Sequence, residues 1–150
     1  MQRQSNYNIA VLVNNTNQIN TLLDKNKFLP ITKSPEIPWS VFFNQVLVAN
    51  VAPIIYCLGD YTIVDPMTLH KIIANYNRFY NEIGAIYSDD INTYQSFHLD
   101  NSINTPIAIN GKINVKIFNE RSTINIFNEA IHKISQKSII YHIPEQLVRL

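Results

Sequence analysis

The stretch from Pro53 to Asp90 constrains the fold more than any other part of the sequence. It begins with the apolar run Ile54 to Leu58, which is typical of a buried strand, and continues through a polar turn. Pro66 then opens a pattern with apolar residues at helical spacing, because proline is well tolerated in the first turn of a helix. A second strand pattern, Gly84 to Tyr87, ends in an acidic pair. This alternation of strand, helix and strand predicts an α/β fold.

The rest of the chain repeats the alternation. Ile9 to Val13 is another apolar run, which we expect to be a central strand beside the two strands above, and Trp39 to Leu47 has the apolar face of a helix. Ser122 to Ile134 carries a further helical pattern, and Ser138 to Ile143 is a strand that we expect Pro144 to end. No repeat or linker interrupts this order. The chain is therefore predicted to be one domain, a mixed sheet flanked by helices.

Two segments carry turn or loop signals. Apolar and polar residues alternate on both sides of Asn110-Gly111, and this pair is the strongest short signal for a hairpin turn. The sequence thus predicts a β-hairpin over residues 107–117, with Ile107 to Ile109 paired to Ile113 to Ile117. Earlier, a cluster of prolines predicts a loop, because proline withholds a backbone donor. These prolines are Pro30, Pro35 and Pro38.

Charge and composition exclude several classes of function. The net charge is +1 and no Lys/Arg cluster is present, so no nucleic-acid footprint is expected. The single Cys57 excludes an internal disulfide framework. The start of the chain has too short an apolar run for a signal peptide, and Asn50 and Pro53 interrupt the longest apolar stretch, so no membrane span is expected. We expect a soluble chain, either cytoplasmic or part of a virus particle.

The layout of residues 53–90 resembles the nucleotide-sugar core of family 2 glycosyltransferases, which have the GT-A fold. Weaker similarities lie outside this stretch. They are the strand from Ile9 to Thr16, Asn44 in the following helix, and Tyr141-His-Ile-Pro-Glu-Gln-Leu near the end. The resemblance implies a GT-A-like domain that lacks the family's first βα unit. It further implies a metal-binding Asp-x-Asp motif, an acidic pair that contacts the nucleotide, and a catalytic Asp.

The acidic residues that the family uses are missing at the matching positions. Gly59 and Tyr61 stand where the resemblance places the two metal-binding carboxylates, and Asn14-Asn15 stand at the nucleotide-contacting pair. Ser122-Thr123 occupy the place of the catalytic Glu-Asp pair. Hard cations such as Mg²⁺ and Mn²⁺ require oxygen ligands, chiefly carboxylates. We therefore expect a catalytically degenerate domain with no cofactor and no metal.

Two alternatives remain open. The first is an active, Mn²⁺- or Mg²⁺-dependent glycosyltransferase that would use a nucleotide sugar and the remaining carboxylates. These are Asp60, Asp89 and Asp90. The second is a carbohydrate-binding module that keeps an acceptor groove lined by aromatic side chains and a histidine. Its candidate contacts are Tyr61, Tyr87, Tyr94 and His98.

The expected role of a degenerate domain is that of a structural or interaction subunit in a larger assembly, such as a virion or phage tail. Without the first βα unit, the Ile9 to Val13 strand would lie at an uncovered sheet edge, and such edges are normally covered. We expect a protein partner to cover it and to contact the neighbouring helix. The helix residues expected at this interface are Trp39, Phe42 and Phe43.

Overall fold

The computed structural model describes residues 7–23, 27–91, 104–112, 117–118 and 125–150 of the chain. Its strands are β1 (Ile9–Val13), β2 (Leu29–Thr32), β3 (Ile54–Cys57), β4 (Thr62–Ile63), β5 (Ile83–Asp90), β6 (Ile107–Asn110) and β7 (Ile139–Arg149). The helices are α1 (Trp39–Ala49), α2 (Thr68–Phe79), α3 (Ile126–Ser135) and the short 3₁₀ helix η1 (Thr16–Ile19).

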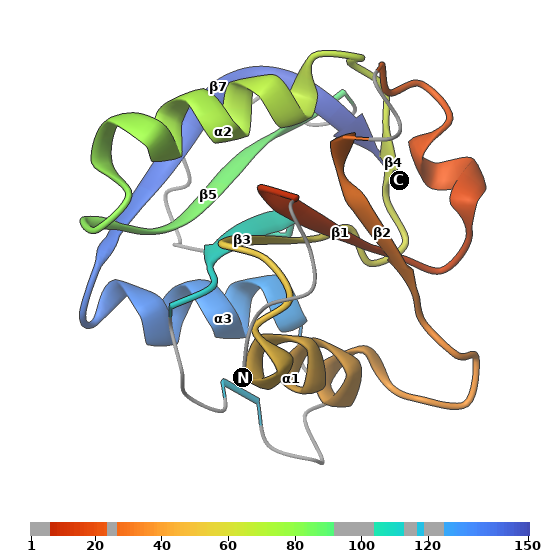
Figure 1. Ribbon diagram of the computed structural model, residues 1–150, viewed down its shortest axis with the longest axis horizontal. Coiled ribbons are helices and arrows are strands. Elements are labelled where there is room, and N and C mark those ends of the chain that lie inside the picture. Colours follow the sequence, from red (N-terminus) through yellow and green to blue (C-terminus); the bar gives the residue numbers. More distant parts are fainter. Residues whose placement is uncertain (1–6, 24–26, 92–103, 113–116, 119–124) are drawn as a thin grey trace.

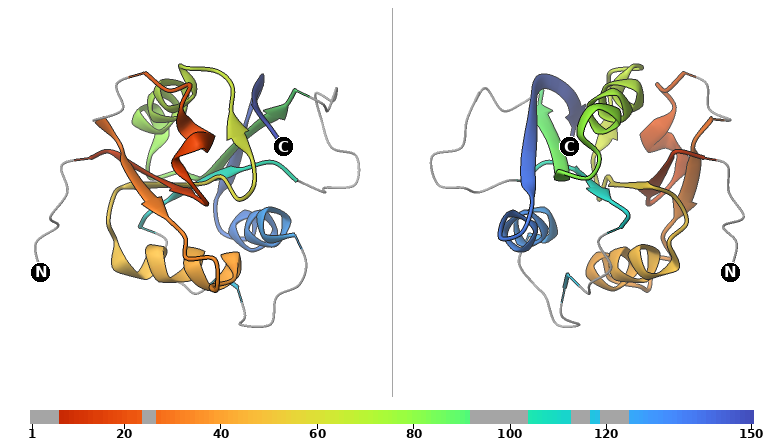
Figure 2. Two further views of the ribbon diagram at one scale, coloured as in Figure 1. Left: turned by 90° about the vertical axis from the view of Figure 1, so that its right-hand side faces the viewer. Right: turned by 60° about the vertical axis from the view of Figure 1, so that its left-hand side comes forward.

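The strands form one seven-stranded sheet in the order β2-β1-β3-β6-β5-β7-β4. β1 is parallel to both β2 and β3, and β5 is parallel to β7, whereas β6 runs antiparallel to both of its neighbours. The sheet curls between two layers of helices: α1 and α3 lie on one side, and α2 covers the other (Figures 1 and 2). The predicted mixed α/β architecture is confirmed, with strands at the three predicted apolar runs.

The core is built from these apolar runs. Every residue of β1, β3 and β6 is buried, as expected for strands that are covered on both faces. The helices add one apolar face each, and Phe43 of α1 is fully buried against the ring of Phe118, with the ring centroids 5.5 Å apart. Asn44 is the polar member of this contact. Its amide donates to the Phe118 carbonyl (2.8 Å) and accepts from the Ile117 N–H (3.0 Å), so it holds residues 117–118 against α1.

The predicted open edge at β1 is wrong. β1 has a partner on each side, because Leu29 to Thr32 pairs with it as strand β2. This segment was expected to be part of a loop because it contains Pro30. A proline is compatible with an edge strand when its missing N–H would point away from the neighbouring strand.

The predicted hairpin is also not formed by the residues that the structure describes. Both sides of β6 are already occupied: Ile109 pairs with Ile55 of β3 and with Ala85 of β5. No edge of β6 is left for the following residues, of which 113–116 lie outside the described part of the chain. The Asn-Gly pair has a different role. Asn110 donates to the Tyr80 carbonyl (2.7 Å), and a Cβ on Gly111 would lie 2.5 Å from the Ala52 carbonyl oxygen.

Pro144 does not end the last strand, which continues to Arg149. The pairing of β7 with β5 shifts at this point, since Ile143 is opposite Ser88 but Gln146 is opposite Asp89. A bulge of this kind accommodates a proline, because the residues within it make no ladder hydrogen bond.

Candidate functional site

The candidate site lies where β1 and β3 end. These strands are parallel, so their carboxyl ends meet at one edge of the sheet, the place where open α/β sheets commonly bind ligands. Gly59 turns the chain away from the end of β3 with a positive φ of 59°, and a Cβ there would lie 2.8 Å from the Phe127 ring. Only glycine satisfies both conditions. The turn exposes Asp60 and buries Tyr61.

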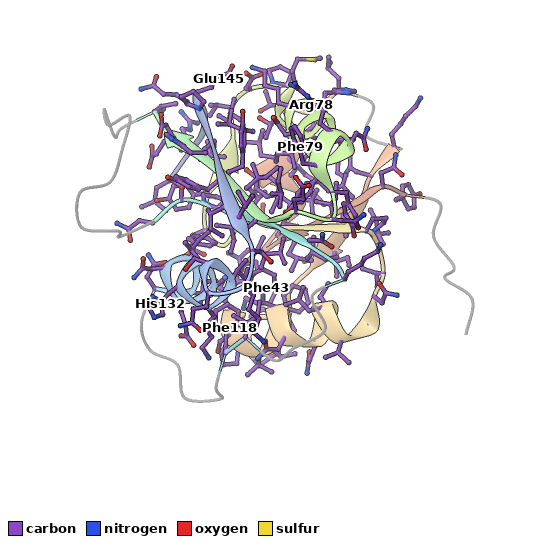
Figure 3. The ribbon with its side chains drawn as sticks, turned by 90° about the vertical axis from the view of Figure 1, so that its left-hand side faces the viewer. Phe43, Arg78, Phe79, Phe118, His132 and Glu145 are labelled. Carbon is purple, nitrogen blue, oxygen red and sulfur yellow. The ribbon has the colours of Figure 1, made fainter. Side chains whose placement is uncertain are left out.

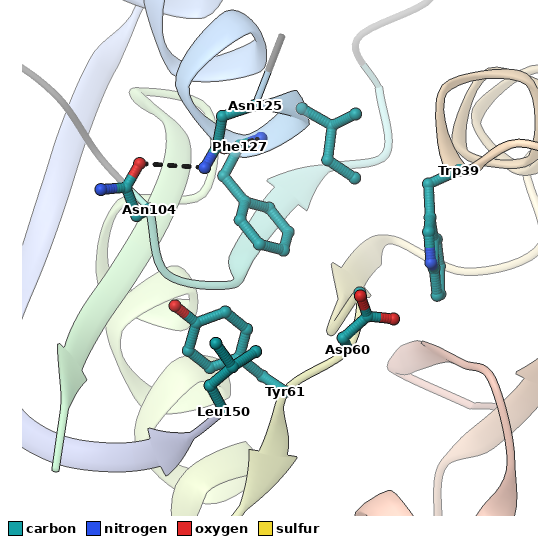
Figure 4. A pocket seen from close by; sticks show the side chains of 9 residues that line it. Trp39, Asp60, Tyr61, Asn104, Asn125, Phe127 and Leu150 are labelled. Atoms are coloured by element: carbon teal, nitrogen blue, oxygen red, sulfur yellow. Dashed lines mark hydrogen bonds between the residues drawn. The ribbon is translucent and has the colours of Figure 1, made fainter. Parts of the chain in front are cut away.

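An open cleft of about 440 Å³ lies over this turn. Its lining combines aromatic rings, amides and one carboxylate, and comes from Trp39, Gly59, Asp60, Tyr61, Asn104, Asn125, Ile126, Phe127 and Leu150. Trp39 stands across the cleft from Phe127, and Asp60 lies between them (Figure 4). The cleft therefore has an apolar wall on each side and a charged group in its middle.

The aromatic ring of Tyr61 packs against the Phe127 wall. Tyr61 and Phe127 pack edge to face, with ring centroids 6.1 Å apart, and both are largely buried. The Tyr61 hydroxyl donates a hydrogen bond to Asp90, which is itself buried at the end of β5. Burial raises the pKa of Tyr61, and the Asp90 charge and hydrogen bond raise it further. Tyr61 is thus a neutral donor fixed in place, and Asp90 serves to hold it.

The turn is held from the other side by polar residues that follow β1. The Gln18 amide donates to the carbonyls of Gly59 (2.8 Å) and Tyr61 (2.6 Å), and Gln18 is buried. Asn14 donates from Nδ2 to Asp60 Oδ1 at 2.7 Å. Asn14 stands where the resemblance placed a nucleotide-contacting acid, and in the structure it orients the Asp60 carboxylate instead.

The rim of the cleft is supplied by amides and by Trp39. Asn125 donates to Asn104 Oδ1 at 2.9 Å, and its own Oδ1 accepts from the Phe127 N–H at the start of α3. This cap is why Phe127 is directed into the cleft at the first turn of the helix. On the opposite rim, the Lys33 ammonium lies 5.5 Å from the centre of the Trp39 ring and donates to nearby carbonyls.

The structure gathers only some of the residues singled out from the sequence. Gly59, Asp60, Tyr61 and Trp39 line the cleft, and Asp90 lies beneath it. The other described candidates lie elsewhere. These are Asp89 and Tyr87, which contact His142, and Phe42 and Phe43, which lie on the buried face of α1. Tyr94, His98 and the pair Ser122-Thr123 lie outside the described residues.

Phe42 and Phe43 cannot serve as an exposed interface, contrary to expectation. Their relative exposures are 8% and 0%, because α1 turns its apolar stripe onto the chain's own sheet. Trp39 is the partly exposed member of the three. The sequence reading missed Gln18, Asn104, Asn125 and Phe127. Asn125 before a helical pattern was a recognisable N-cap signal, but nothing in the sequence linked it to Gly59.

No three His, Cys, Asp or Glu side chains in the described part of the chain come close enough together to hold a metal ion. Asp89 and Asp60 are separately engaged: His142 Nε2 lies 2.7 Å from Asp89 Oδ1, and Asn14 bonds Asp60. Cys57 is buried, and burial raises the pKa of its thiol, so it is not an activated nucleophile. Across the described residues, no helix has the length and apolar character needed to span a bilayer.

Comparison with known proteins adds no assignment. No protein-family model matches the sequence, and none of the curated proteins matches it. Functional inference therefore rests on the geometry of the cleft and on the layout of residues 53–90.

Proposed function

We propose that this chain is a carbohydrate-binding domain with a glycosyltransferase-like layout, and that it binds a neutral sugar in the cleft without transferring it. The observation that carries the proposal is the composition of the cleft, in which aromatic rings on both walls flank amides and one carboxylate. Sugar rings present apolar C–H faces to aromatic side chains and hydroxyls to amide and carboxylate groups. A few polar groups in an aromatic-lined cleft are also the usual make-up of a small-molecule site.

The charge of the lining favours a neutral ligand over a nucleotide sugar. Asp60 is the one charged side chain among the nine lining residues, and none of them is Lys or Arg. A diphosphate placed beside an uncompensated carboxylate is repelled at close range. Sugar hydroxyls are hydrogen-bond donors, so they pair with Asp60 and need no cation.

The positions of the remaining carboxylates favour binding over catalysis. An active transferase would need Asp60, Asp89 and Asp90 to cooperate, but each has a different neighbour. Asp60 bonds Asn14, Asp89 bonds His142, and Asp90 accepts from Tyr61. A carboxylate buried beneath a tyrosine serves poorly as the general base for an incoming hydroxyl, which must lie within hydrogen-bond reach of it.

The role expected first from the sequence, a structural subunit of a virion, tail or other assembly, has weaker support. That expectation rested on an uncovered edge at β1 and on an exposed apolar face of α1. In the structure β2 covers β1, and Phe42 and Phe43 are buried. We keep an assembly as the setting in which a sugar-binding domain could act, with protein partners unassigned.

The test is a titration of isotope-labelled protein, followed by NMR, with a panel of neutral oligosaccharides and separately with nucleotide sugars plus Mn²⁺. We expect millimolar or tighter binding of at least one neutral sugar, with shifts centred on residues 59–61. Trp39→Ala should weaken it about tenfold or more, the loss of one good stacking contact. Phe79→Ala removes an exposed aromatic side chain from α2 on the other face of the sheet, and should leave binding unchanged.

Two results would overturn the proposal. Micromolar, metal-dependent binding of a nucleotide sugar that Asp60→Asn abolishes would favour the active enzyme. A panel in which no neutral sugar shifts residues 59–61 would leave the cleft without its proposed ligand.

A further inference from the structure

The polar groups of the cleft are divided between an acceptor in its middle and donors at one rim. Asp60 lies between Trp39 and Phe127, and the amide pair of Asn104 and Asn125 lies on the Phe127 side (Figure 4). Hydrogen bonds from the rest of the chain orient both groups. These bonds determine what each group can offer to a ligand.

At the rim, the start of α3 sets the direction of both amides. Asn125 Oδ1 accepts from the N–H groups of Phe127 (2.9 Å) and Asn128 (3.1 Å), which identifies its other terminal atom as the donor Nδ2. That Nδ2 donates to Asn104 Oδ1 at 2.9 Å. Both side-chain oxygens are therefore engaged, and within the described residues nothing accepts from Asn104 Nδ2. Asn104 is exposed, so the rim offers N–H donors to a ligand.

In the middle of the cleft the polarity is reversed. Asn14 donates to Asp60 Oδ1 at 2.7 Å, and no other hydrogen bond reaches this carboxylate from the described part of the chain. Asp60 is exposed, so its Oδ2 can accept from a ligand. An ionised carboxylate accepts but cannot donate. The ligand group that meets Asp60 therefore has to carry a donor.

Apolar surface accompanies the donors of the rim. Ile126 and Phe127 directly follow Asn125 at the start of α3, and both line the cleft. A hydroxyl group that bonds the amides leaves this apolar surface in contact with water, whereas a methyl group covers it. The Phe127 side of the cleft is thus suited to a ligand group that combines an acceptor with a methyl.

An acetamido substituent on a sugar ring has all of these features. Its amide is planar and trans, so the N–H and the carbonyl point in opposite directions, and the methyl group lies beside the carbonyl. The N–H suits Asp60, the carbonyl suits the amide rim, and the methyl suits Ile126 and Phe127. A protonated amine would also be drawn to Asp60, but it has neither the carbonyl nor the methyl.

We infer that the sugar bound in the cleft is an N-acetylhexosamine, with its acetamido group on the Phe127 side and its ring toward Trp39. The inference rests on the proposed function, because it names the sugars that the same cleft selects. One hydrogen bond and one buried methyl group together correspond to about a tenfold preference over the parent hexose.

Matched pairs of sugars test this preference. The probes are the methyl glycosides of N-acetylglucosamine and glucose, of N-acetylgalactosamine and galactose, and of glucosamine with its amine protonated. Each is titrated into the isotope-labelled full chain and followed by NMR. We expect at least one acetamido sugar to bind about tenfold more tightly than its hydroxyl counterpart, with shifts at residues 59–61 and 125–127. The signals of His132, which is exposed further along α3 (Figure 3), should not move.

Asn104→Asp tests the role of the rim. The variant keeps the oxygen that accepts from Asn125 but replaces the N–H groups with a second acceptor. Binding of the acetamido sugar should fall about tenfold, while binding of the hydroxyl sugar should not fall. The matched control is Asn17→Asp. Asn17 is exposed, lies outside the cleft lining and likewise accepts at Oδ1 from an asparagine, Asn20 (3.4 Å), so this variant should keep the preference.

Three results would overturn the inference and leave sugar binding in place. In the first, the acetamido and hydroxyl members of both pairs bind equally at residues 59–61. In the second, the glucosamine glycoside binds most tightly, which would make charge the basis of selection. In the third, Asn104→Asp keeps the full acetamido preference. A chain in which no sugar shifts residues 59–61 would instead remove the proposed function, and this inference with it.

Discussion

The two outer regions of the sheet manage the same problem differently. On one side β2 has four residues, and the Lys33 N–H donates to the Val13 carbonyl, so Pro30 and Thr32 are the outward positions. Only Thr32 has an N–H to present. On the other side β7 has eleven residues and pairs with β5 along its length, whereas β4 pairs with it only at Val148 and Arg149. A short edge strand with a proline at its first outward position offers little to another strand.

The difference lies in how much of each strand the chain itself covers. Leu29 and Ile31 of β2 are partly buried, whereas Ile139 of β7 is mostly exposed. β2 thus finishes the sheet as a short, half-covered strand, and β7 is a long strand with an exposed apolar side chain at its start.

The largest expected effect comes from disrupting the junction at β6, the strand that joins the two regions of the sheet by pairing with β3 and β5. In Gly111→Val the new Cβ meets the backbone carbonyls of Ala52 and Pro53, at 2.5 and 3.0 Å, and backbone cannot yield as a side-chain end does. We expect a loss of about 3 kcal/mol or more in the free energy of unfolding, measured by urea denaturation. Lys112→Ala, at the exposed neighbouring position, should change it by less than about 0.5 kcal/mol. A stable Gly111→Val variant would show that β6 does not bind β3 as closely as described.

A second variant tests how firmly the β2 side is built. Asn44→Ala removes the acceptor for the Ile117 and Phe118 N–H groups and the donor to the Phe118 carbonyl, all of them buried. Unsatisfied buried groups cost about 1–3 kcal/mol each, so we expect a loss of about 2–3 kcal/mol in unfolding free energy. Gln45→Ala, exposed on the same helix, serves as the control. If the two variants have the same free energy of unfolding, water replaces the hydrogen bonds of Asn44, and this region is more accessible to solvent than described.

Removing the proline of β2 should make this edge more adhesive. Pro30→Thr restores an outward N–H, and an edge with an added donor is a better template for another strand. Sedimentation should then show more self-association at high concentration than for the unchanged chain. Unchanged association in Pro30→Thr would break the comparison.

The smallest effect concerns pH on the β7 side, where Lys71 links Asp65 to Glu145. The hydrogen bond from Lys71 holds the pKa of Asp65 below its usual 3.8, so its stabilisation is present above that pH. It is lost as the pH falls through the lower, folded-state pKa. The pair is partly exposed, and we expect about 0.5 kcal/mol. Asp65→Asn should flatten the stability profile below about pH 4 in urea denaturation at a series of pH values. If the Asp65→Asn variant still loses stability below about pH 4 as the unchanged chain does, this assignment is contradicted.

The sequence predicted the elements better than their pairing. Apolar runs and helical stripes are local signals, and they located β1, β3, β5 and all three helices. Which strands become neighbours depends on contacts far apart in the chain, and no local signal placed β6 between β3 and β5. The Asn110-Gly111 pair misled for this reason: its glycine is needed for the close approach to residues 52–53, not for a tight turn.

The residues of the candidate site likewise fall into those that the sequence predicted and those that it did not. Gly59 to Tyr61 were singled out from their place after a strand, and they do line the cleft. The opposite wall comes from Phe127 and Asn125, more than 60 positions later, and the bonds from Gln18 cross 41 and 43 positions. Those contacts follow from the topology of the sheet, which the strand patterns alone did not determine.

The central position of β6 has a consequence for how the chain is made. A ribosome delivers β3 and β5 well before β6, so a growing chain holds two apolar strands whose shared partner has not yet been synthesised. β3 can pair with β1 but keeps its other edge open, and β5 has no strand partner, until residue 110 has emerged and β6 has inserted between them. Such exposed edges invite misassembly during translation. We therefore expect the nascent chain to gain protease resistance in one late step, after β6 leaves the exit tunnel, and not gradually as each βα pair appears.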